Sequence, residues 1–301
     1  MSQNKAIIDI GSNNVLLLIA QLQEKGELTL HRASRISELA KDMKDGILTK
    51  AGIDRTLSII RSYIATALRF DSEIFLIATS AARDAVNIDK LSIPLLKEYG
   101  LQLHIISGEE EAKLNGLANM NEFDAESLLV FDIGGGSTEF SLIQNQEIIG
   151  KQSIDLGIRR LDNLFGDNAW QEREYIKKCL NEISMKPSKE IMLVGVGGTV
   201  TSLAAMLLGL KKYDEEQVHG YKISSDDIEN TLEKVKRLSA EQVPQLLPFN
   251  PISRSLLLTG IIIVSEIIAL FNAPVFFVSD RTWQYGILAE LRHGRWNNAR
   301  N

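Results

Sequence analysis

The chain has 301 residues, of which 45% are hydrophobic and 24% are charged, so it is long enough for two globular domains and a substantial core. The formal net charge is −6 and neither half of the chain is basic, which gives no indication of a nucleic-acid surface. Cys179 is the only cysteine, which excludes an internal disulfide, and no charged-then-apolar leader opens the chain, so we expect a cytoplasmic protein.

Three short apolar segments open the chain, and their spacing predicts an antiparallel meander of strands over residues 6–11, 15–22 and 28–33. The first segment ends in Asp9-Ile-Gly11, and Ser12, Asn13 and Asn14 form the turn that follows it.

Helices and strands then alternate through the rest of the first half. The apolar spacing predicts a helix over residues 51–70, and hydroxyl groups before Arg83 favour the start of another helix. With the meander, these elements indicate an α/β domain with a mixed sheet. The remaining predicted elements are strands at 74–78 and 101–106 and a helix at 107–120.

The stretch from Val130 to Glu139 has the strongest functional pattern. An apolar strand ends in Asp132, three glycines follow, and Ser137, Thr138 and Glu139 lead into a second apolar segment. Glycines let ligand oxygens approach backbone N–H groups, and successive N–H groups in such a turn form an anion site. A hairpin that binds no ligand could carry the same glycines, but the flanking acids favour a phosphate site with a divalent cation on Asp132.

Part of this pattern is repeated near the start of the chain. Asp9-Ile-Gly-Ser12 recurs as Asp132-Ile-Gly-Gly135, each time between two predicted strands. The repeat predicts two related domains that face each other across a cleft.

The second half repeats the alternation of elements. Residues 190–199 indicate a strand that ends in a second glycine turn, and residues 253–272 indicate an apolar helix. Because this helix contains Ser265 and Glu266, and a membrane span needs about 20 residues with few charges, we predict that it lies in a protein core. The other predicted helices lie between 156 and 183, at 199–208 and at 224–238. A strand is predicted at 275–278, and after it a last helix that Ser279-Asp280 caps and that runs to 291, followed by a polar tail at 292–301.

Three acids follow Ser107 in the predicted first turn of a helix, at residues 109–111. Ser107 and Glu110 match a capping box, and acids favour the N-terminal end of the helix dipole, so structure alone can account for Glu110. Glu139 has no such explanation, because an acid in a strand has to face water or a cation. Arg83 fits either a phosphate ligand or an ordinary surface position, and the histidines have no metal-ligand spacing.

Seven motifs follow one another in order over nearly the whole chain. They are Asp9-Ile-Gly-Ser-Asn13, Ala78-Thr-Ser-Ala-Ala-Arg83, Ile106-Ser-Gly-Glu-Glu-Glu-Ala112, Asp132-Ile-Gly-Gly-Gly-Ser-Thr-Glu139, Leu156-Gly-Ile-Arg-Arg-Leu161, Val218-His-Gly-Tyr221 and Val278-Ser-Asp280. Together they resemble the exopolyphosphatase and guanosine pentaphosphate phosphatase family. The resemblance implies the actin-like, ribonuclease H-like α/β fold, with one such domain at 1–123 and another at 124–286, an active-site cleft between them, and a C-terminal helix at 287–301 that packs on the first domain.

The resemblance also implies hydrolysis of a terminal phosphoanhydride with Mg²⁺ or Mn²⁺. The family's general base falls on Glu110, although a third acid, Glu109, here precedes the family's acid pair. Glu139 would hold the attacking water or the cation, and Asp132 the cation. The residues implied to bind phosphate are Ser12, Asn13, Arg83, Gly135, Gly136, Ser137 and Thr138.

Inorganic polyphosphate is therefore the expected substrate, and guanosine pentaphosphate is the alternative within the same class. A non-catalytic actin-like module that holds a nucleotide is the alternative of a different class, although Glu110 and Glu139 favour an enzyme. We expect no nucleic-acid or membrane partner, and the resemblance is compatible with a homodimer. Departures from the family pattern at 195–199 and 279–286 concern ligand contacts of the second domain and leave the catalytic motifs intact.

Overall fold

The computed structural model describes residues 4–185 and 191–296. These residues form two compact units. The first contains the chain up to Glu111 and the segment from Gln284 onward, and the second contains Ala112–Trp283. Residue 190, where we placed the start of a strand, and residues 297–301, the end of the predicted tail, lie outside the described ranges.

The first unit is built on a five-stranded mixed sheet with the order β3-β2-β1-β4-β5. The predicted meander is confirmed, because β1, β2 and β3 pair antiparallel in sequence. The next two strands pair parallel, β4 with β1 and β5 with β4. The strands are β1 (Asn4–Ile10), β2 (Asn14–Leu22), β3 (Glu27–Ile36), β4 (Glu73–Ala78) and β5 (Leu103–Ile105).

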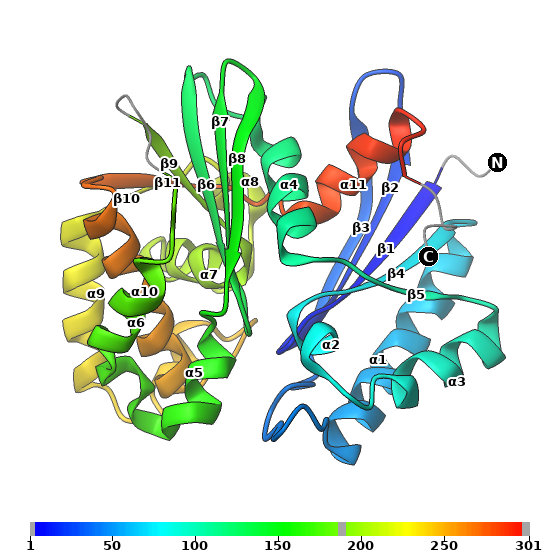
Figure 1. Ribbon diagram of the computed structural model, residues 1–301, viewed down its shortest axis with the longest axis horizontal. Helices are drawn as coiled ribbons and strands as arrows, with labels where there is room; N and C mark the ends of the chain where they lie inside the picture. The colour runs from blue at the N-terminus through cyan, green and yellow to red at the C-terminus, as the bar shows by residue number, and fades with distance from the viewer. Residues whose placement is uncertain (1–3, 186–190, 297–301) are drawn as a thin grey trace. The chain divides into compact units, whose positions relative to one another are not determined.

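Helices pack on both faces of this sheet. Helix α1 (Lys50–Arg69) begins at Thr49, whose Oγ1 accepts a hydrogen bond from the Gly52 N–H at 3.1 Å. Its apolar face packs against Ala6, Ile8 and Ile10 of β1, which point to one side because side chains alternate along a strand. In Figure 1, α1 and α3 (Asp89–Tyr99) lie on one side of the sheet and α11 (Trp283–Arg292) on the other. The short α2 (Ser80–Asp84) follows β4.

The second unit contains a six-stranded sheet with the order β10-β11-β9-β6-β7-β8. Strands β6, β7 and β8 form an antiparallel meander, and β9 and β11 continue the sheet in parallel. This is the plan of the first sheet with β10 added at one edge, so the repeat predicted from the two Asp-Ile-Gly motifs and the actin-like architecture are confirmed. The strands are β6 (Ser127–Ile133), β7 (Thr138–Gln144), β8 (Glu147–Ile154), β9 (Met192–Val196), β10 (Lys222–Ser224) and β11 (Val275–Val278).

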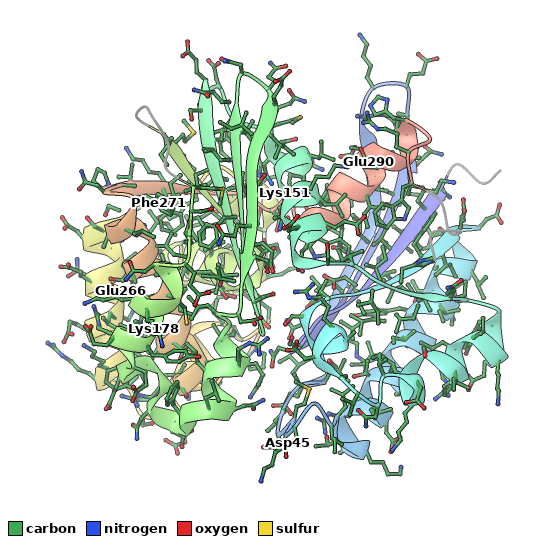
Figure 2. All side chains as sticks on the ribbon, viewed as in Figure 1. Asp45, Lys151, Lys178, Glu266, Phe271 and Glu290 are labelled. Carbon is green, nitrogen blue, oxygen red and sulfur yellow. The ribbon has the colours of Figure 1, made fainter. Side chains whose placement is uncertain are left out.

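The core of the second unit lies on one face of this sheet. Helix α10 (Arg254–Leu270) is buried along most of its length, as predicted for a core helix. Its Glu266, labelled in Figure 2, accepts a hydrogen bond from Arg173 Nη1 at 2.9 Å. The other helical elements are α4 (Gly108–Asn119), α5 (Ile158–Phe165), η1 (Gly166–Gln171), α6 (Arg173–Leu180), α7 (Gly197–Leu207), α8 (Glu215–Val218), α9 (Ser225–Arg237) and η2 (Val243–Leu246).

The opposite face of the sheet lies against α4, as Figure 1 shows. Leu129, Phe131 and Ile133 of β6 belong to the large core beneath α10. Leu128 and Val130, which alternate with them, pack with the residues that follow α4. Asp132 therefore lies on the α4 face. Among the described residues, no helix has the length and apolar character needed to cross a membrane.

Three local predictions were wrong. The glycines after β9 do not form a turn, because the strand leads directly into α7 at Gly197. Thr79 makes no side-chain cap to α2. The last helix begins at Trp283 and not at Ser279-Asp280, because the Ser279 hydroxyl accepts from the Arg281 N–H within the preceding loop and the Asp280 carboxylate accepts from Tyr213.

Candidate active site

The glycine turn between β6 and β7 is held from behind by the start of α5. The carbonyl of Gly135 accepts hydrogen bonds from the N–H groups of Arg159 and Arg160 at 2.7 and 2.9 Å, and Ile158 N–H donates to Gly134 at 3.1 Å. The Arg160 side chain adds a bond of 2.6 Å from Nε to the Gly136 carbonyl. The carbonyl groups of the turn are thus directed towards α5.

The N–H groups of the same turn have a different environment. Among the residues that the structure describes, none accepts a hydrogen bond from the N–H of Gly135 or Gly136. Neither glycine has a positive φ, so what the glycines contribute here is the close approach that the missing Cβ atoms permit. Two adjacent peptide N–H groups without a protein acceptor are the donors that an anion site needs.

Close packing explains why the residue behind the turn is a glycine. A Cβ atom at Gly157 would lie 2.5 Å from both the N and the C atoms of Gly136, a separation that real Cβ atoms essentially never show. The Thr138 hydroxyl donates to the carbonyl of Leu156 at 2.5 Å and is fully buried. The Leu156-Gly157 motif therefore supports the turn, and the side chain of Thr138 is committed to that support.

Two carboxylates lie side by side next to the turn. Asp132 on β6 is directly opposite Glu139 on β7, and Glu139 is directly opposite Ser153 on β8. Residues that face each other across antiparallel strands share one face of the sheet, with Cβ atoms about 4.5–5.5 Å apart. Ser153 Oγ donates to Glu139 Oε1 at 2.8 Å, and both acids are buried, with exposures of 7% for Asp132 and 1% for Glu139.

The carboxylate of Asp132 is confined by two further elements. Asn115 of α4 donates from Nδ2 to Asp132 Oδ2 at 3.0 Å. On the other side, a Cβ atom at Gly197 would lie 2.2 Å from Asp132 Oδ1, and the φ of +82° at Gly197 itself favours glycine at the start of α7. Burial raises the pKa of Asp132 to about 6, against the lowering effect of the hydrogen bond from Asn115.

This arrangement fits a magnesium site of limited protein ligation. Among the residues of the described ranges, no group of three His, Cys, Asp or Glu side chains could hold a metal ion. Mg²⁺ usually binds through one or two carboxylates and keeps its other positions for water and substrate phosphates. Asp132 and Glu139 supply two such carboxylates, and the carboxylate of Asp132 keeps lone pairs beyond the one used by Asn115.

In the first unit, the turn after β1 carries Ser12 and Asn13. Ser12 is buried, with 4% of its surface exposed, and its carbonyl accepts from the Ala40 N–H at 2.9 Å. The Asn13 carbonyl accepts from the N–H groups of Ser37 and Glu38, both at 2.9 Å. The segment after β3 thus holds this turn in place.

Asp9 occupies the position in β1 that Asp132 has in β6, since each precedes Ile-Gly at the end of its strand. It is likewise buried, with 7% exposure. Asp9 was not among the predicted site residues, although the repeated motif pointed to it.

The three acids of the first turn of α4 have different surroundings. Ser107 Oγ accepts from the Glu110 N–H at 3.1 Å, but within the described ranges the Glu110 carboxylate does not accept the reciprocal bond that a complete capping box needs. Glu111 is buried, and its Oε2 lies 3.0 Å from Arg83 Nη1. Glu110 is partly exposed, and no described residue pairs with its carboxylate, while Glu109 is exposed.

Arg83, which the sequence placed at the start of a helix, lies in the last turn of the short α2. Its Nη1 also donates to the Ile106 carbonyl at 3.0 Å, so it connects the end of α2 to the segment before α4. Within the first unit the structure thus joins Arg83 to Glu111. Within the second unit it joins Asp132 and Glu139 at the glycine turn. Sequence reasoning missed the supporting residues Asn115 and Gly197.

Comparison with protein families gives one match that spans most of the chain. The model of the Ppx/GppA phosphatase family matches residues 18–293. Exopolyphosphatase 2 of Mycobacterium tuberculosis is 30% identical over 287 residues, which cover 87% of this chain and 89% of that protein. A bifunctional 3-dehydroquinate synthase/phosphatase of Fusobacterium nucleatum is 29% identical over 95% of this chain, which spans only 46% of that longer protein.

Solved structures agree with this match. The crystal structure of the Aquifex aeolicus member of the Ppx/GppA family superimposes with a TM-score of 0.79 at 27% identity, covering 98% of this chain and 99% of that one. An exopolyphosphatase from Cytophaga hutchinsonii has a TM-score of 0.87 at 23% identity, with 97% of this chain and 98% of that chain covered, and it supports the fold alone.

Proposed function

Because the chain belongs to the Ppx/GppA phosphatase family, we propose that it is a phosphoanhydride hydrolase that releases terminal phosphate from inorganic polyphosphate. The observation that carries this proposal is the pair of facing carboxylates, Asp132 and Glu139, beside a glycine turn. Two N–H groups of this turn donate no hydrogen bond to any described residue. Transfer of a phosphoryl group to water asks a protein mainly for positioning and for stabilisation of negative charge.

Each part of the chemistry has a residue suited to it. The N–H groups of Gly135 and Gly136 would hold phosphate oxygens, with Ser12, Asn13, Ser137 and Arg83 as further donors. We assign Mg²⁺ or Mn²⁺ to Asp132 and Glu139, where it would neutralise charge that develops on the phosphate oxygens. Thr138, by contrast, would act by holding the turn in place, because its hydroxyl donates to the Leu156 carbonyl.

Glu110 is the residue that we assign as general base. A base has to be able to accept a proton from the attacking water, and a carboxylate held in an ion pair does this poorly. Glu111 is paired with Arg83, whereas the carboxylate of Glu110 has no partner within the described ranges. This contrast favours Glu110 over Glu111 and keeps the assignment made from the sequence.

The substrate can be tested directly. Phosphate release should be measured with polyphosphates of defined length, guanosine pentaphosphate and ATP, each with Mg²⁺ and with Mn²⁺. We expect the largest kcat/KM for polyphosphate. A larger value for guanosine pentaphosphate would make the protein a pentaphosphate 5′-phosphatase. Release from none of the three would support a non-catalytic nucleotide-binding module instead.

A further inference from the structure

We infer that Asn115 is a positioning residue, which orients the Asp132 carboxylate for a divalent cation. The inference rests on the proposed function, since it concerns the same metal site. Asn115 has no role in the mechanism described above, and its position in the sequence, inside a helix and 17 residues before Asp132, carries no recognised motif.

The contact between the two side chains is well shielded from solvent. Asn115 is 2% exposed and Asp132 is 7% exposed, and the distance from Nδ2 to Oδ2 is 3.0 Å. A hydrogen bond from a neutral donor to a buried carboxylate fixes the plane of the carboxylate and leaves its other lone pairs for a metal ion. Metal-ligating carboxylates are commonly held in this way by residues that do not touch the metal.

Asn115 is itself held in place by the next turn of α4. Asn119, which is fully buried, donates from Nδ2 to the Asn115 carbonyl at 2.9 Å and to the Arg281 carbonyl at 2.8 Å. The chain of contacts thus runs from the loop after β11 through α4 to Asp132. An amide anchored at its own backbone can fix the direction of a carboxylate more firmly than a side chain on a mobile loop.

Gly197 restricts the carboxylate from the opposite side. Because a Cβ atom there would lie 2.2 Å from Asp132 Oδ1, the first residue of α7 lies directly against this oxygen. With Asn115 bonded to one oxygen and the Gly197 backbone packed against the other, rotation of the carboxylate is limited on both sides.

Stability alone does not explain an asparagine at this position. Its Oδ1 atom is buried and has no hydrogen-bond partner among the described residues. Burying an unsatisfied acceptor is costly, and a leucine of similar size would avoid that cost. Reversing the amide would place Oδ1 against the carboxylate, so the donor is directed to Asp132. The useful feature of the amide is therefore the bond that it donates to Asp132.

The test compares Asn115→Leu with the wild type by direct Mn²⁺ binding, measured without substrate from the electron paramagnetic resonance signal of free Mn²⁺. We expect the dissociation constant to rise by about 10- to 100-fold. Turnover should fall at low Mn²⁺ and recover towards the wild-type value at saturating Mn²⁺. If the leucine variant does not fold, Asn115→Ala, which has a smaller side chain, should likewise have a higher dissociation constant for Mn²⁺ than the wild type.

Ser141→Ala is the matched control. Ser141 lies on the same face of β7 as Glu139 and contacts α4 at Gly116, and its buried Oγ has no hydrogen-bond partner in the described residues. The Ser141→Ala variant should bind Mn²⁺ with the same dissociation constant as the wild type. Equal weakening in this control, or unchanged binding in both Asn115 variants beside normal wild-type binding, overturns the inference and leaves the proposed function standing. A wild type that neither binds Mn²⁺ nor releases phosphate overturns both.

Discussion

Glu110 and Glu111 are neighbours in the first turn of α4, but their carboxylates have different surroundings. The Glu111 side chain is 9% exposed and paired with Arg83, whose side chain is 21% exposed. Successive residues of a helix point about 100° apart, so an inward-facing Glu111 places Glu110 on a different side of the helix. A buried, paired acid serves structure, while a partly exposed and unpaired acid is available to exchange a proton with water.

Substitution of Glu110 by glutamine should therefore remove the base and preserve the fold. We expect kcat on polyphosphate to fall by roughly 100- to 10,000-fold, which is the usual contribution of general-base catalysis, while substrate binding persists. Steady-state phosphate release and equilibrium binding of polyphosphate would measure the two effects. Near-normal turnover in Glu110→Gln together with a large loss in Glu109→Gln or Glu111→Gln would show that the base lies at a neighbouring position.

The sequence could predict the residues of the site better than the residues that support them. Asp132, Glu139 and the glycines stand in one short stretch with a recognisable pattern. Asn115 reaches Asp132 only because α4 packs across β6, and an isolated asparagine in a helix has no pattern that reports such a contact. Similarly, the pairing of Glu111 with Arg83 depends on tertiary structure that joins residues 28 positions apart.

The junction between the glycine turn and α5 is packed so closely that added side-chain atoms cannot be accommodated there. The Gly135 carbonyl receives two N–H groups from α5, and Gly157 lies against the backbone of Gly136. A turn fixed in this way presents its free N–H groups in one orientation, which is the condition for binding an anion without reorganisation.

We expect Gly157→Ala to push α5 away from the turn, because the added methyl group would lie 2.5 Å from backbone atoms that cannot rotate aside. The free energy of unfolding should fall by about 3 kcal/mol, at the upper end of the cost of overpacking. Urea denaturation measures this loss. Gly198→Ala is the control, since a Cβ atom at Gly198 has open space around it and should change stability little. Equal losses in both variants would contradict the steric explanation.

The packing of α1 on the first sheet leads us to predict how stability changes at alkaline pH. Tyr63 is 4% exposed, and burial raises its pKa to about 12 from 10.0. The folded state therefore holds the phenol proton more tightly than the unfolded state. The resulting stability is fully present below pH 10 and is lost as the pH rises to about 12.

Between pH 10 and pH 12 we expect the wild type to lose about 2–3 kcal/mol more stability than Tyr63→Phe, which has no proton to release. Urea unfolding of both proteins at pH 9, 10, 11 and 12 would measure the difference. Parallel pH profiles for the two proteins would show that Tyr63 ionises as readily in the folded state as in the unfolded state.

Elements with strong apolar periodicity, such as α1, α9 and α10, could be predicted from the sequence nearly to their ends. Helix α3 was missed, because it buries only Leu91 and Leu95 and contains Pro94, so its apolar pattern is short and its proline is unfavourable within a helix. The start of α7 was misjudged because a glycine-rich sequence after a strand is equally typical of a turn.

At the scale of the whole molecule, the repeated sheet order could be inferred from a very small signal. Three identical residues, Asp-Ile-Gly, mark the end of β1 and of β6, and the same succession of a meander followed by parallel strands surrounds both. The elements that distinguish the second unit, including β10 and the helices before β11, have no counterpart in the first motif. Their positions depend on core packing and could not be read from the repeat.

The first unit is discontinuous in sequence, and this has a consequence for its assembly on the ribosome. Gln284 donates from Nε2 to the Ile7 carbonyl at 3.3 Å, and Tyr285 OH lies 3.2 Å from Thr29 Oγ1, so the unit that begins with β1 is completed only by α11. The second unit is one uninterrupted segment. During synthesis the domain translated first should thus finish folding last. The test uses arrested nascent chains with a C-terminal linker long enough to bring Trp283 out of the ribosomal tunnel while α11 is still inside it. Limited proteolysis of these chains should find Ala112–Trp283 resistant and the earlier residues still cleavable, whereas early resistance of both would mean that α11 is dispensable.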